Sequence, residues 1–172
     1  MILLDFKMDL SDIEHTESLL NELRQRSDDN SLLDIYAPLG TLEFIVNGKN
    51  MSWCSSTAPK EEIVAFARSL SNIVHRLKLG EEIKQPRIMN GGNRWFKLVE
   101  PDTVCIKTGS STITQTQCSY SELKQATETF CRKLYEEISE RFPDYFALMD
   151  LSMCGDSRIP CGEKLVQTLL QR

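Results

Sequence analysis

Among the side chains of this 172-residue chain that could act as nucleophile or general base are six cysteines and two histidines. Cys54 and His75 are the pair that could work together, as a thiol and the imidazole that accepts its proton. That chemistry also needs hydrogen-bond donors for an oxyanion, and no glycine-rich turn precedes either residue. Cys54 ends a predicted strand, and His75 lies beside the apolar stripe of a predicted helix. We therefore expect structural positions for both residues and keep a cysteine-dependent hydrolase as an alternative function.

The residues that could hold a metal ion or a cofactor are weaker candidates than this cysteine–histidine pair. His15 lies between Glu14 and Glu17, but Glu14 and His15 are adjacent and would diverge on a helix. The cysteines contain no C-x-x-C pair of the kind that holds zinc. Asn90-Gly91-Gly92-Asn93 matches neither glycine-rich phosphate motif, and a predicted strand follows it rather than a helix. We expect no metal and no cofactor.

A moderately basic stretch could bind nucleic acid. Residues 76–107 contain seven bases and four acids, and Trp95 and Phe96 lie among them. Bases beside aromatic rings can combine phosphate contact with base stacking. If the strand alternates, however, Trp95 or Phe96 must face the core, and the positive excess is small for an acidic protein. An RNA-binding module is therefore a second alternative, and we do not expect nucleic acid as the principal partner.

The surplus negative charge lies near the start of the chain. The formal net charge is −5, yet residues 1–34 hold nine acids against three bases, while the rest holds sixteen acids against seventeen bases. Such asymmetry affects association with partners rather than fold. An anionic surface would steer a basic partner and raise its association rate. The predicted partner-binding residues are Asp9, Asp12, Glu14, Glu17, Asp28, Asp29 and Asp34.

The elements that must position these residues include a hairpin that leads into a helix. Strands are predicted at 103–108 and 111–117, and Ser119 to Glu122 has the spacing of a helix capping box. Pro143 ends the helix. The residues that place one apolar face along it are Leu123, Ala126, Phe130, Leu134 and Ile138.

A similar unit comes earlier in the chain. Asn47-Gly48 predicts a type I′ turn between strands at 41–46 and 49–54. Residues 55–59 open a second predicted helix. Further strands are predicted at 2–8 and 94–100, with a polar connection before the latter. The apolar stripe of the second helix is Ile63, Phe66, Ala67, Leu70, Ile73, Val74 and Leu77.

Short hairpin connections force antiparallel pairing, so the predicted fold is α+β. It has a largely antiparallel, twisted sheet of meander hairpins, covered by amphipathic helices on one face. The length fits one domain over residues 1–172, with 143–172 as a helical tail packed on it. No apolar run approaches the ~18 residues of a membrane span, and the N-terminus does not resemble a signal peptide. We expect a cytoplasmic protein with reduced, mostly buried thiols.

Three stretches between residues 94 and 141 carry a family resemblance. They are Arg94-Trp95-Phe96-Lys97-Leu98, Thr103-Val104-Cys105-Ile106-Lys107, and Tyr120-Ser121-Glu122-Leu123 with the helix through Glu136-Glu137-Ile138. They resemble small bacterial immunity proteins, the inhibitors encoded beside polymorphic or contact-dependent growth-inhibition toxins. The resemblance implies a non-enzymatic protein that occludes the active site or docking surface of a cognate toxin domain. Many such toxins are nucleases with basic clefts, which would suit the acidic segment.

Overall fold

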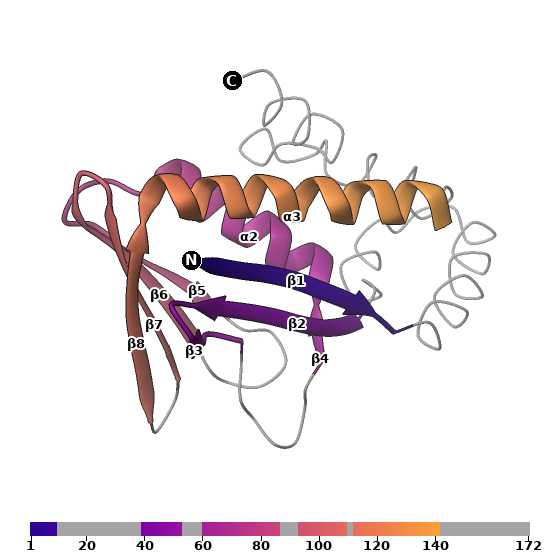
Figure 1. Ribbon diagram of the computed structural model, residues 1–172, viewed down its shortest axis with the longest axis horizontal. Coiled ribbons are helices and arrows are strands. Elements are labelled where there is room, and N and C mark those ends of the chain that lie inside the picture. The colour runs from indigo at the N-terminus through magenta and orange to yellow at the C-terminus, as the bar shows by residue number, and fades with distance from the viewer. Residues whose placement is uncertain (10–38, 53–59, 87–92, 110–111, 142–172) are drawn as a thin grey trace, which may run out of the picture.

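The computed structural model describes residues 1–9, 39–52, 60–86, 93–109 and 112–141. These residues form an α+β fold of antiparallel meander strands and two helices, which confirms the predicted class (Figure 1). The described strands divide into two four-stranded sheets, here called sheet A and sheet B, rather than one. The predicted tail at 143–172 lies outside the described residues.

Sheet A is built around strand β2. β2 (Leu39–Val46) pairs antiparallel with β1 (Ile2–Met8), with β3 (Lys49–Asn50) and with β4 (Lys60–Glu62). The β2–β3 turn is the predicted one, since Asn47 and Gly48 have φ values of 50° and 75°, the positive range that a type I′ turn requires. Residues 60–62, expected within the helix opened by 55–59, are instead strand β4, because they pair with Leu39 to Thr41.

Sheet B is a simple meander in the order β5-β6-β7-β8. Its strands are β5 (Glu82–Pro86), β6 (Asn93–Glu100), β7 (Thr103–Gly109) and β8 (Ile113–Ser119). β5 falls where the sequence predicts only a polar connection. It forms because it pairs with β6, a tertiary contact that its own polar composition does not announce.

The two helices carry the predicted apolar stripes. Six of the seven predicted stripe residues lie in α2 (Ile63–Arg76), and they and Leu77, which follows the helix, are buried. On α3 (Tyr120–Arg141), Leu123, Phe130, Leu134 and Ile138 are buried and Ala126 is half-buried. One half of the predicted capping box is present, because the Glu122 N–H donates to Ser119 Oγ at 3.3 Å. Glu122 itself lies 3.0 Å from the Met1 amino group.

A cap that the sequence analysis missed comes from Asp102, in the β6–β7 turn. Its Oδ1 accepts the Ser121 N–H at 2.9 Å, its Oδ2 accepts the Ser119 hydroxyl at 2.7 Å, and its carbonyl accepts the Tyr120 N–H at 3.0 Å. These hydrogen bonds lower the pKa of the Asp102 carboxyl, chiefly those from Ser119 and then Ser121. The turn between two strands of sheet B therefore holds the first turn of α3 in place.

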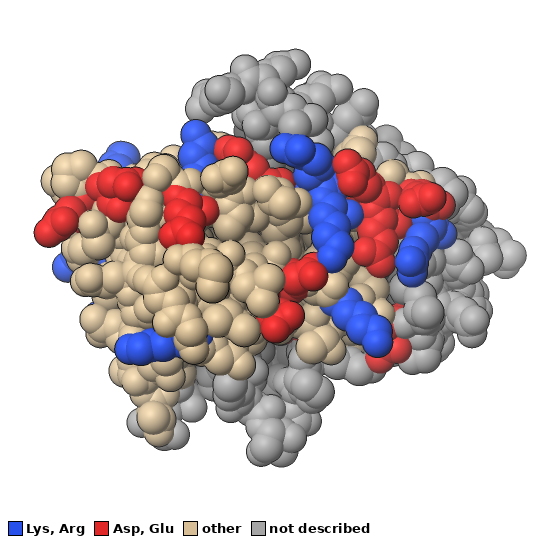
Figure 2. Space-filling view, in the orientation of Figure 1, with Lys and Arg blue, Asp and Glu red and all other residues tan. Residues whose placement is uncertain are grey.

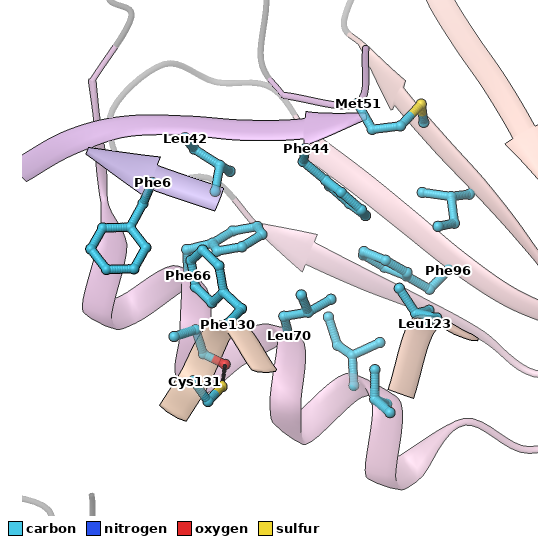
Figure 3. Packing of buried hydrophobic residues seen from close by; sticks show 14 of the residues in the cluster. Phe6, Leu42, Phe44, Met51, Phe66, Leu70, Phe96, Leu123, Phe130 and Cys131 are labelled. Atoms are coloured by element: carbon cyan, nitrogen blue, oxygen red, sulfur yellow. Dashed lines mark hydrogen bonds between the residues drawn. The ribbon is translucent and has the colours of Figure 1, made fainter. Parts of the chain in front are cut away.

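One hydrophobic core joins both sheets and both helices (Figure 3). The Phe130 ring of α3 packs edge-on against Phe6 of β1 and Phe66 of α2, with centroids 5.3 and 5.6 Å apart. α3 runs above β1, which forms one edge of sheet A (Figure 1), and Lys133 pairs with Asp5 there. A helix over an outer strand is one way in which proteins shield a sheet edge.

Sheet B meets sheet A where β8 approaches the β2–β3 turn. The backbone carbonyl of Gln117 accepts from Asn47 Nδ2 at 2.7 Å, and that of Gln115 accepts from Lys49 Nζ at 2.8 Å. The Thr116 hydroxyl reaches the Val46 carbonyl at 3.4 Å. The side chains of Asn47 and Lys49 thus donate to carbonyls of β8, an edge strand of sheet B, and these hydrogen bonds join the two sheets.

Candidate functional site

The acidic segment leaves and rejoins the described fold at one end of sheet A. Asp9 follows β1, and its N–H donates to the Leu39 carbonyl at 3.0 Å at the start of β2. The neighbouring pair is Met8 and Gly40. Only glycine fits at residue 40, because a Cβ there would lie 2.7 Å from the Lys7 carbonyl oxygen and 2.8 Å from Ile63 Cγ1.

The chain between these anchor points is strongly acidic. Residues 10–38 contain seven acids and two bases. Of the predicted partner-binding residues, Asp9 is described and is half-buried at the end of β1. The others, Asp12, Glu14, Glu17, Asp28, Asp29 and Asp34, lie outside the described residues, so their clustering stays a prediction.

The structure describes one member of the predicted thiol–imidazole pair. His75 is exposed in the last turn of α2, and its Nδ1 lies 2.9 Å from the Ser71 carbonyl of the same helix. Cys54 lies outside the described residues, so its pairing with His75 stays untested.

The structure describes the surroundings of three other cysteines. Cys105, Cys118 and Cys131 are free and buried, as the sequence predicts for thiols in structural positions. Burial raises the pKa of the Cys118 and Cys131 thiols to about 12. The Cys131 thiol points to the Ala67 carbonyl of α2, 3.9 Å away (Figure 3). Because the thiolate is the nucleophilic form, Cys118 and Cys131 are placed for packing rather than for attack.

The fold places some residues of the basic stretch at 76–107 in the core and others at the surface. Phe96 is completely buried and Trp95 is half-buried, as strand alternation requires. Arg94, counted in the sequence as part of a basic surface, is only 1% exposed and faces the core. It therefore contributes no charge to the surface.

Arg94 is instead the centre of a buried polar cluster. Its Nη2 and Nη1 donate to the two carboxylate oxygens of Glu61 at 2.6 and 3.4 Å, and its Nε donates to the Met51 carbonyl at 2.9 Å. The guanidinium lies 5.1 Å from the centre of the Phe66 ring. Such a paired, fork-shaped arrangement holds β4, the β3 end and β6 in register. No sequence signal reveals it, because the partners are 33 and 43 residues away.

The same inward-facing row of sheet B carries two further polar groups. Gln85 and Thr108 are the cross-strand neighbours of Arg94 on β5 and β7, and both are buried. Within the described part of the chain, Gln85 Oε1 and Thr108 Oγ1 have no hydrogen-bond partner. This end of the interior is therefore polar, whereas the next row is apolar on β5, β6 and β7, where it contains Ile83, Phe96 and Ile106.

The outward face of sheet B carries three bases of the basic stretch, Lys84, Lys97 and Lys107. Lys84, Trp95 and Lys107 are direct cross-strand neighbours on β5, β6 and β7. Lys97 lies two residues from Trp95 on the same face, opposite Glu82, and Glu82 is 3.4 Å from the Lys107 amine. An aromatic side chain is thus flanked by lysines, an arrangement set by register rather than by spacing in the sequence.

Part of the face seen in Figure 2 carries few charged side chains. Figure 2 shows charged side chains gathered over α3, while the area over β8 and the β2–β3 turn is mostly neutral. Ile113 of β8 is 58% exposed and Leu3 of β1 is 45% exposed. Scattered exposed apolar side chains are common on soluble proteins, so these two residues do not define a site.

No protein-family model matches the sequence, and neither a curated protein nor a solved structure is significantly similar to it. Within the described ranges, no group of three histidine, cysteine or acidic side chains could hold a metal ion. No helix in that part of the chain is long and apolar enough to cross a membrane.

Proposed function

We propose that this protein is a non-catalytic, cytoplasmic binding protein that neutralises a cognate bacterial toxin by covering its active site or docking surface. The observation that carries the proposal is the charge of residues 10–38, seven acids against two bases, between two neighbouring strands. The hydrogen bond from Asp9 to Leu39 brings the two ends of this segment together. A concentrated anionic segment suits a basic toxin surface, since complementary charge raises the association rate and excludes other partners.

The first test is direct inhibition. The chain would be co-expressed with the toxin domain encoded next to its gene, and the purified pair would be assayed for a one-to-one complex and for loss of toxin activity. Protection of cells together with stoichiometric inhibition supports the proposal. A toxin domain that stays fully active at excess inhibitor contradicts it.

The second test examines the acidic segment itself. Reversing Asp12, Glu14 and Glu17 to lysine should slow association about tenfold at low salt and flatten its salt dependence. The matched control reverses Glu81, Glu136 and Glu140, which are exposed and distant in sequence from the segment. Equal effects of the two triple variants on the association rate would mean that net charge acts, rather than this segment.

A further inference from the structure

On the outward face of sheet B, the strand register places an aromatic side chain between two lysines, an arrangement that suits ligand binding. Lys84, Trp95 and Lys107 form one row across three strands, and Gln115 of β8 continues it. At the β8 end, Lys49 Nζ lies 2.8 Å from the Gln115 carbonyl. Neighbouring strands are ~4.8 Å apart, so a lysine stem flanks the indole at about that spacing on each side.

The side chains of this row reach the surface, and the Lys107 amine also pairs with Glu82 Oε2 at 3.4 Å. Lys84 is exposed, the Lys107 side chain is 35% exposed, and Trp95 is half-buried with its backbone fixed in the middle of the sheet. A second row on the same face adds Lys97 and one acid, Glu82. Because β6 is paired on both sides, the backbone of Trp95 is held within the sheet.

We propose that this face binds single-stranded nucleic acid, with a base stacked on Trp95 and phosphates contacted by Lys84 and Lys107. Every base offers a flat π-face to the accessible part of the Trp95 indole, and lysines on either side supply the complementary charge. Protein–protein interfaces are depleted in lysine, so lysines that directly flank the aromatic residue favour a phosphate backbone over a protein surface. Binding of nucleic acid at this face does not depend on toxin inhibition by the acidic segment.

The binding test uses a fluorescein-labelled, mixed-sequence 12-nucleotide RNA and its DNA counterpart, measured by anisotropy between about 50 and 200 mM salt. Trp95→Ala should weaken binding at least about fivefold, because a stacked base is lost. Trp95→Phe keeps an aromatic face and should retain most of the affinity. Urea unfolding of Trp95→Ala, compared with the parent protein, shows whether any loss in that variant comes from misfolding.

The lysines are tested by the salt dependence. Lys84→Gln with Lys107→Gln should reduce the slope of log K against log salt by about 1.4, which corresponds to two phosphate contacts at ~0.7 each. The control pair is Lys78→Gln with Lys124→Gln, which lie outside sheet B and should leave the slope unchanged.

Three outcomes would overturn the inference. The first is no binding of either oligonucleotide at about 50 mM salt. The second is an equal loss in the control lysine pair, which would mean diffuse charge rather than this face. The third is a poly-glutamate peptide of matched charge that competes as well as unlabelled RNA, which would indicate an acidic protein partner.

Discussion

Replacing Arg94 by methionine should be among the most destabilising single changes in this protein. The substitution keeps an unbranched stem in the core but removes the guanidinium that binds Glu61 and the Met51 carbonyl. It takes the cation away from a carboxylate whose side chain is 11% exposed, and it removes the donor from a backbone carbonyl. The cluster is buried, so water cannot readily replace either contact.

The expected size follows from that burial. Removing one partner of a buried ion pair costs about 3–5 kcal/mol. The partial exposure of Glu61 favours the lower end, about 3 kcal/mol, since some solvation of the carboxylate remains. For a chain of this size, that corresponds to a fall in Tm of roughly 6–12 °C. Arg94→Met combined with Glu61→Leu removes both charges and should recover about 2 kcal/mol of the loss.

The assay is urea unfolding followed by circular dichroism, with the free energy of unfolding extrapolated to water. Arg141→Met is the matched control, because Arg141 and Glu137 form an ion pair at 3.7 Å in which the Arg141 side chain is 52% exposed. That change should cost less than about 0.5 kcal/mol. The reasoning is refuted if Arg94→Met and Arg141→Met cost the same, or if the double variant is less stable than Arg94→Met alone.

Two further predictions concern ionisation. The pKa of Asp102 is lowered from its ordinary value of 3.8 in the folded state, so its contribution to stability is present above about pH 3.8 and is lost as pH falls through the folded pKa. Asp102→Asn should therefore make the acid-induced loss of stability shallower below that pH, as measured by urea titrations at several pH values, and an unchanged pH profile would contradict the cap. Native Cys118 and Cys131 should resist a thiol reagent at neutral pH and react fully in urea, because burial raises the pKa of each to about 12. In the same mass-spectrometric experiment, rapid labelling of Cys54 alone would favour the hydrolase alternative.

The sequence by itself determined the local elements. Asn47-Gly48 specified its turn because positive φ at two successive residues is accessible to few residue types. The stripe from Ile63 to Leu77 specified a buried helix face because its period matches the helix. Ser119 marked the start of α3 because its hydroxyl can cap an N–H three residues later. Each of these signals is complete within a few neighbouring residues.

Only the tertiary structure decided where the charges of 76–107 lie. Arg94 and Lys107 both count as basic in the sequence, yet strand register and facing send the first into the core beside Glu61 and the second to the outward face beside Trp95. β5 and the Asp102 cap were likewise invisible, because each depends on a partner brought near by folding. The sequence shows the chemistry of each side chain. The surroundings of that side chain are set by residues far away along the chain. At Arg94 and Trp95, those surroundings decide whether the side chain lies in the core or at the surface.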